Sequence, residues 1–91
     1  MTTLKKLDGP DSWHLEAKRL LRLELKRHRV GYKKLAVLLN AIGVAETERS
    51  IANKLARGTF SFVFYLQCLR AMEADARSAG EVAEALAQRI S

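Results

Sequence analysis

Apolar residues recur along most of this chain at the three-to-four-residue spacing that is typical of amphipathic helices. The first such run occupies residues 11–29, where Asp11 or Ser12 can act as the helix cap. Val30 and Gly31 follow it, and Gly31 is a candidate for the left-handed residue that ends a helix. The apolar positions of this helix are predicted to share one face, which holds Trp13, Ala17, Leu20, Leu21 and Leu25.

A second, shorter helix is predicted over residues 32–41, and Gly43 should stop it. The turn that follows, NAIGVAET over residues 40–47, is longer than the three to four residues usual between two closely packed helices. The extra residues could splay the next helix from its usual angle. The buried stripe of the second helix is expected to contain Leu35, Leu38, Leu39 and Ile42.

A third helix is predicted over residues 48–57, between two clear boundary signals. Thr47 has the side chain of a helix N-cap, and Gly58 can end the helix in the left-handed conformation. Ile51 and Leu55 stand one turn apart and should anchor this helix in the core.

A fourth helix should begin after Ser61 and run to about Ala74, and Gly80 marks a weak break before a fifth helix over residues 79–90. Phe64 is the aromatic residue of this region that we expect to be exposed and available to a second subunit. The inward face of the fourth helix is predicted to hold Phe62, Tyr65, Leu66, Cys68, Leu69 and Met72. The fifth helix carries an apolar stripe of Val82, Leu86 and Ile90.

Together these segments predict an all-α fold of four to five helices in one domain over residues 11–91, preceded by a flexible N-terminal arm over residues 1–10. The 91 residues are 48% hydrophobic, which is enough for one modest core. Cys68 is the single cysteine, so an internal disulfide is excluded. We expect no metal or other cofactor. The chain has no apolar run of membrane-spanning length and no signal-peptide pattern, so the expected compartment is the cytoplasm.

Positive charge is concentrated in the first two thirds of the chain. Residues 1–60 contain 13 Lys and Arg against 6 Asp and Glu, whereas residues 61–91 contain 3 against 4. A concentrated basic surface favours polyanion binding, because neutralised phosphates release counterions. An ordinary solvated surface is the alternative explanation of the same charge.

The order of these motifs resembles the lambda-repressor-like helix-turn-helix superfamily. Leu35-Ala36 matches the Leu-Ala pair of its first motif helix, Arg57-Gly58 matches the end of its recognition helix, and the Leu66, Leu69 and Met72 stripe matches the following helix. Over residues 25–72 the chain is also similar to a small bacterial domain family of unassigned function. That similarity rests on Tyr-x-x-Leu-Ala, Asn-Lys and Phe-Ser…Phe-x-Leu-Gln-Cys-Leu-Arg. The resemblance implies a helix-turn-helix formed by the second and third helices.

One face of the third helix has the chemistry to contact DNA bases. With Ile51 and Leu55 inward, the 100° step of a helix turns Arg49 and Asn53 outward, and Ser50 flanks them. Arg pairs with guanine and Asn with adenine in the major groove. An ordinary solvated helix face would look much the same. The candidate base contacts are Arg49, Ser50 and Asn53, and the candidate phosphate contacts are Lys33, Lys34, Lys54 and Arg57.

Three functions remain open at this point. The first is a small bacterial DNA-binding protein that regulates transcription, acting as a homodimer formed through the fourth and C-terminal helices. The alternative is a protein-interaction module, such as an adaptor or antitoxin-like subunit that binds an acidic partner. RNA binding is less favoured, because no exposed aromatic platform is evident. An enzyme is not expected, since no paired carboxylates, activated nucleophile or phosphate loop is present.

Overall fold

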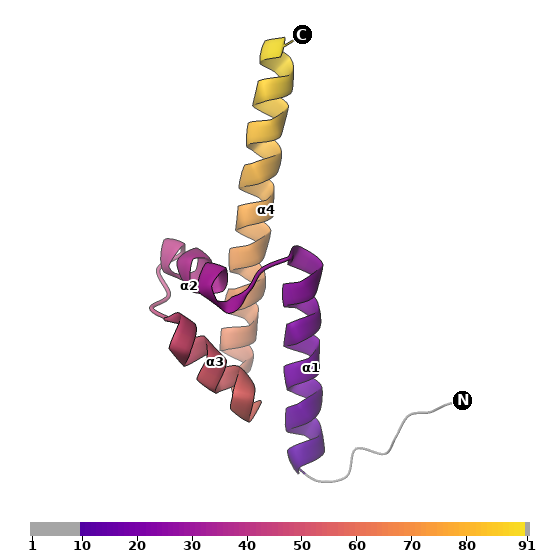
Figure 1. Ribbon diagram of the computed structural model, residues 1–91, viewed down its shortest axis with the longest axis vertical. Coiled ribbons are helices and arrows are strands. Elements are labelled where there is room, and N and C mark those ends of the chain that lie inside the picture. Colours follow the sequence, from indigo (N-terminus) through magenta and orange to yellow (C-terminus); the bar gives the residue numbers. More distant parts are fainter. Residues whose placement is uncertain (1–9, 91) are drawn as a thin grey trace, which may run out of the picture.

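The computed structural model describes residues 10–90 and, within them, contains four helices and no strand. The helices are α1 (Pro10–His28), α2 (Tyr32–Ala41), α3 (Glu48–Arg57) and α4 (Phe62–Ile90). Helices α1 and α4 run side by side in the same direction (Figure 1). Helix α2 packs on α4 and on α3, and α3 also contacts α1. The predicted all-α class is therefore confirmed. The predicted N-terminal arm lies outside the described residues, except that α1 begins at Pro10.

The predicted fifth helix does not exist as a separate element, because α4 continues through Gly80 to Ile90. A glycine inside a helix costs only about 1 kcal/mol relative to alanine, so it weakens a helix without ending it. The residues on both sides of Gly80, ARSA and EVAEALAQ, are mostly strong helix formers that outweigh this cost. The weak break predicted at Gly80 was therefore wrong, and the C-terminal half of α4 projects beyond the other helices (Figure 1).

Helix α1 ends two residues earlier than a cap at Gly31 would require. Arg29 has a φ of 57°, and it is the residue that takes the left-handed conformation. The amide of Arg29 donates to the Lys26 carbonyl at 3.1 Å and the amide of Val30 to the Leu25 carbonyl at 2.9 Å. This pair of bonds is a Schellman motif, closed by contact between the two buried residues Leu25 and Val30. Gly31 is instead the N-cap of α2, with extended backbone, so its prediction as the helix end was wrong.

Arg29→Gly is expected to raise the free energy of unfolding by about 0.5–1 kcal/mol, because glycine adopts the left-handed conformation without the steric cost that a Cβ imposes. Arg29→Ala is the matched control, since it removes the same exposed charge and keeps the Cβ. Urea denaturation of both variants measures the difference. Equal stability of the two variants would contradict this explanation.

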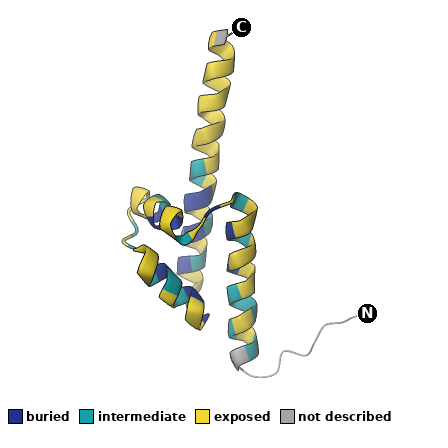
Figure 2. Cartoon of the chain, viewed as in Figure 1, coloured by how far each residue is buried: buried dark blue, intermediate teal, exposed yellow. Residues whose placement is uncertain are grey.

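The core lies where α2, α3 and the first half of α4 meet, and α1 closes one side (Figure 2). Buried hydrophobic residues are Leu21, Leu25, Val30, Leu35, Ala36, Leu39, Ile51, Leu55, Phe64, Cys68, Ala71 and Met72. Both anchors of α3 are fully buried, as predicted. Trp13, Leu20 and Ile42, which were predicted to face inward, are exposed instead.

The inward face of α4 is also shifted from its predicted position. Phe64 is 4% exposed and packs against Phe60, with ring centroids 5.8 Å apart, whereas Phe62 is 70% exposed. Leu66 is exposed as well. The prediction that Phe64 is the exposed aromatic residue was therefore wrong, and Phe62 has that position. The cause is the choice between two overlapping stripes, since Phe64, Cys68 and Met72 recur at helical spacing and so do Phe62, Leu66, Leu69 and Met72.

Candidate nucleic-acid interface

The third helix is fixed at its N-terminus by a capping box. The Thr47 hydroxyl accepts from the Ser50 amide at 3.0 Å, and the Ser50 hydroxyl accepts from the Thr47 amide at 2.8 Å. Two amides that would otherwise lack partners at the helix start are thereby satisfied. The predicted N-cap at Thr47 is confirmed. Ser50, a candidate base contact, uses its side chain within this cap.

Glu46 connects the turn before α3 to the helix itself. The Ser50 hydroxyl donates to one Glu46 carboxylate oxygen at 2.6 Å, and the Lys54 ammonium pairs with the other oxygen. The Lys54 nitrogen also lies over the ring of Phe64, 4.7 Å from its centroid. The Glu46 side chain is only 8% exposed. Glu46 therefore holds Ser50 and Lys54 against the core, and the Lys54 charge is neutralised within the chain.

The Glu46 carboxylate remains ionised because its partners outweigh its burial. Burial alone would raise its pKa, but the hydrogen bonds from Lys54 and Ser50, with the charge of Lys54, hold the pKa below its ordinary value of 4.5. Beneath this group, burial raises the pKa of the Cys68 thiol to about 12, and the Glu46 charge adds to the effect. Cys68 is thus a protonated core residue, as the sequence indicated.

The outer face of α3 carries the candidate contacts that the structure leaves available. Arg49, Asn53 and Arg57 are exposed on the side opposite Ile51 and Leu55. None of the three makes a hydrogen bond or ion pair with another of the described residues. Such a face offers one amide and two guanidinium groups free to bind an external partner.

The remaining two candidate phosphate contacts lie at the start of α2. Lys33 and Lys34 are both exposed, and Lys34 pairs with Asp75 of α4 at 3.5 Å. Lys33 has no such partner among residues 10–90. Of the seven residues predicted for DNA contact, four have no polar partner within the described part of the chain, and three, Ser50, Lys34 and Lys54, are engaged by other residues of it.

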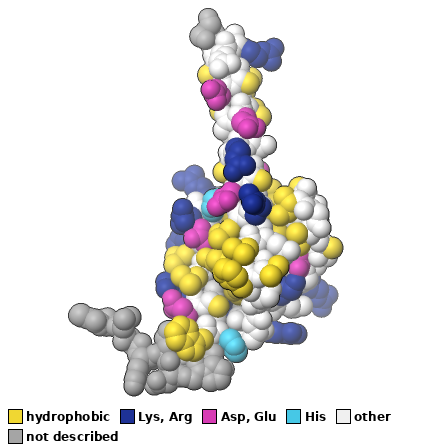
Figure 3. Space-filling view, turned by 180° about the vertical axis from the view of Figure 1, so that it is seen from behind, with side chains coloured by type: hydrophobic (Ala, Val, Ile, Leu, Met, Phe, Trp, Pro, Cys, Tyr) yellow, Lys and Arg dark blue, Asp and Glu magenta, His cyan; other side chains and the backbone are white. Residues whose placement is uncertain are grey.

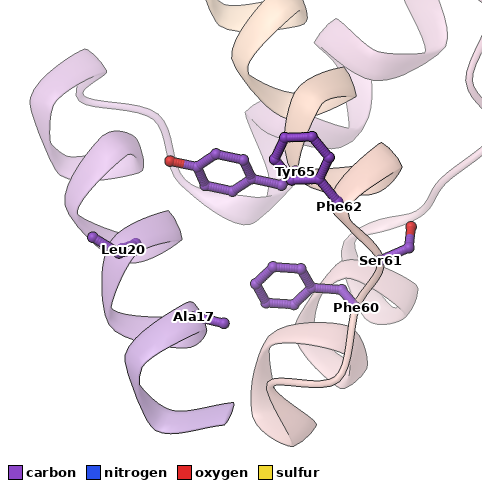
Figure 4. A pocket seen from close by; sticks show the side chains of 6 residues that line it. All are labelled: Ala17, Leu20, Phe60, Ser61, Phe62 and Tyr65. Carbon is purple, nitrogen blue, oxygen red and sulfur yellow. The ribbon is translucent and has the colours of Figure 1, made fainter. Parts of the chain in front are cut away.

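A shallow apolar groove separates α1 from the start of α4. It is lined by Ala17, Leu20, Phe60, Ser61, Phe62 and Tyr65. The rings of Phe60 and Tyr65 point toward α1, whereas the Ser61 side chain points away from it (Figure 4). The rings of Phe62 and Tyr65 stack with centroids 6.3 Å apart. Seen from behind, hydrophobic side chains gather on one face of the molecule, and both basic and acidic side chains lie at its edges (Figure 3). The sequence indicated these aromatic residues only as core, so this groove was not foreseen.

The described residues define a small all-helical domain with a basic surface. No group of three His, Cys, Asp or Glu side chains within them could hold a metal ion. Their helices also lack the combination of length and apolar character needed to cross a bilayer. A family model, described as a domain of unknown function (DUF6471), matches residues 13–76. The chain belongs to this family, which agrees with the predicted similarity to a small family of unassigned function. No match was found among curated proteins or among solved structures.

Proposed function

We propose that this protein binds double-stranded DNA through the outer face of α3, with α2 and α3 acting as a helix-turn-helix of the lambda-repressor-like kind. The observation that carries the proposal is the exposed set of Arg49, Asn53 and Arg57 opposite the buried anchors. Arg49 and Asn53 are one turn apart and have the donors and acceptors that read guanine and adenine. The net charge of +6 supports attraction to the phosphate backbone.

The hydrogen bonds and ion pairs within the chain indicate which residues are available to contact bases and which to contact phosphates. Arg49 and Asn53 are assigned to base edges, and Lys33 and Arg57 to phosphates. Ser50 and Lys54 leave the proposed contact set, because Glu46 and the helix cap occupy their polar atoms. Lys34 is a secondary phosphate contact, since its ion pair with Asp75 is exposed and therefore weak.

The rigidity of α3 also supports this role. The helix is capped at Thr47 and ends at Gly58 in the left-handed conformation, with the Gly58 amide bonded to the Lys54 carbonyl at 3.0 Å. A helix fixed at both ends presents its side chains without a further ordering cost on binding. We further infer a regulatory role in bacterial transcription, consistent with a sequence-reading helix on a small domain.

Binding of an acidic protein partner is the second candidate, and the groove between α1 and α4 favours it. Phe62, Tyr65 and Leu20 provide an apolar surface for a partner protein. The net charge of +6 favours an acidic partner over a basic one. A partner of this class would contact α1 and α4 and leave the outer face of α3 free.

Selection of bound sequences from a random duplex library, followed by fluorescence anisotropy over a salt series, tests the DNA proposal. Arg49→Ala combined with Asn53→Ala is expected to weaken binding to the selected duplex at least about tenfold, and to a random duplex by much less, because base contacts specify sequence. Lys33→Ala is expected to weaken both duplexes equally and to reduce the salt slope by about 1.

Arg77→Ala is the matched control, since it removes an exposed arginine charge far from α3 and should change neither affinity by more than about twofold. Absence of any duplex binding at low salt would contradict the proposal. Loss of an acidic-protein complex in Phe62→Ser, with DNA binding absent, would support the second candidate.

A further inference from the structure

The C-terminal part of α4 has a surface that the other described helices do not cover. We call residues 76–89 the overhang, and every one of them is exposed (Figure 2). It spans about 21 Å at the rise of an α-helix. The family match ends at residue 76, so nearly all of the overhang lies outside the matched domain.

The apolar stripe of the overhang continues the core-facing line of α4. At 100° per residue, Ala79, Val82 and Leu86 fall on the same side of the helix as Phe64, Cys68 and Met72. The first half of this line is buried against the other helices, and Lys34 of α2 reaches Asp75 at its end. Beyond Asp75 the line is uncovered, with Val82 60% and Leu86 52% exposed.

The charges of the overhang favour a copy of the same helix over a polyanion. The overhang contains two arginines, Arg77 and Arg89, and two glutamates, Glu81 and Glu84, so it has no net charge. Arg77, Glu81 and Glu84 lie on the side of the helix opposite the stripe. Two overhangs can therefore approach stripe to stripe without net repulsion, whereas nucleic acid gains nothing there.

We call the packed part of the chain, residues 10–75, the body. The face of α4 on which the body packs sets the direction in which two copies can pair. Helix α2 packs on the face of α4 that would meet the partner, so two parallel α4 helices would bring the helices packed on each of them into collision. An antiparallel pair places the bodies at opposite ends. It also sets Leu86 of one chain opposite the small residues Ala79 and Gly80 of the other, which leaves room for close packing.

We propose that the overhang is a homodimerisation helix that pairs antiparallel with the overhang of a second copy. The pairing covers the stripe of each chain with the stripe of the other. It requires no nucleic acid and is independent of the function of α3, so a failure of DNA binding would leave it unaffected.

Sedimentation velocity over a concentration series tests the interface. Val82→Gln combined with Leu86→Gln is expected to raise the dimer dissociation constant at least about tenfold. The matched control is Val63→Gln combined with Leu66→Gln, because these residues have the same types and similar exposure, 61% and 46%, on the first half of α4. The control should leave the dimer intact. A monomeric wild-type chain at every concentration, or loss of the dimer in the control alone, would overturn the proposal.

Disulfide cross-linking under mild oxidation tests the direction of pairing. In the antiparallel arrangement Ala83 lies close to the two-fold axis, so Ala83→Cys should link two chains. Ala76→Cys should not, because its two copies would lie about 21 Å apart along the helix axis. The native Cys68 is buried and does not interfere. Linking of both variants would show a parallel pair, and linking of neither would show that the overhangs do not meet; either result contradicts the proposal.

Discussion

Gly58→Ala is expected to lower the free energy of unfolding by about 3 kcal/mol, which is a large part of the stability of a domain of this size. Two costs add at this position. Gly58 has a φ of +70°, a conformation that costs a residue with a Cβ about 1–2 kcal/mol. An added Cβ would also lie 2.5 Å from the backbone oxygen of His14 in α1. The backbone cannot rotate away, so α1 and α3 must separate, at a further cost of about 1–3 kcal/mol.

Alanine variants of two other glycines distinguish the cost of the left-handed conformation from the cost of the contact with His14. Gly43 has a φ of +87° and no atom within 4 Å of an added Cβ, so Gly43→Ala should show the conformational cost alone. Gly31 has ordinary extended backbone and the same open space, so Gly31→Ala should show neither cost. Urea denaturation of the three variants measures the series. Equal losses at Gly58 and Gly43 would mean that the contact between α1 and α3 is looser than the structure indicates.

Lys54→Met is expected to lower the free energy of unfolding by about 2 kcal/mol near neutral pH, because it leaves the Glu46 carboxylate nearly buried and without its cation. The loss should shrink in acid. In the wild-type protein the pKa of Glu46 is lowered, so its contribution is present above the ordinary value of 4.5 and is lost as the pH falls through the folded value. In the variant, protonation of Glu46 removes an unpaired charge, so acid relieves part of the damage.

Lys33→Met is the control for this measurement, since it removes an exposed lysine that has no partner among the described residues. It should change the free energy of unfolding by no more than about 0.5 kcal/mol at either pH. Urea denaturation near pH 7 and near pH 3.5 gives all four values. A loss in Lys54→Met that is the same at both pH values would show that its cause is packing against Phe64 and not the Glu46 charge.

Local signals in the sequence were sufficient to predict where α2 ends and where α3 begins and ends. Thr47, Gly43 and Gly58 act through atoms within a few residues, so their roles as cap and stops can be read directly from the chain. The end of α1 could not be found in this way. Arg29 takes the left-handed conformation, which accompanies burial of Val30 and Leu25, and an arginine gives no local sign of that conformation.

The buried face of α4 could not be predicted from local sequence patterns, because it depends on contacts with other helices. Its first half has two overlapping apolar stripes at helical spacing, and only packing against the other helices determines that Phe64 is inside and Phe62 outside. The candidate site has the same limit. Arg49 and Asn53 could be placed on the outer face from helix geometry, but the sequestration of Lys54 depends on Glu46, eight residues away across a turn, and on Phe64 in another helix.

The uninterrupted course of α4 has a consequence for the order of folding and assembly. Starting a helix is unfavourable, whereas extending one that already exists is nearly neutral for good helix formers. The half of α4 that is buried in the body supplies the nucleus, and residues 76–89 propagate from it as added turns. The same residues as a free peptide would be too short to hold a helix in water. The stripe of Val82 and Leu86 therefore exists as a surface only after the body has folded, so recognition between copies is restricted to native chains.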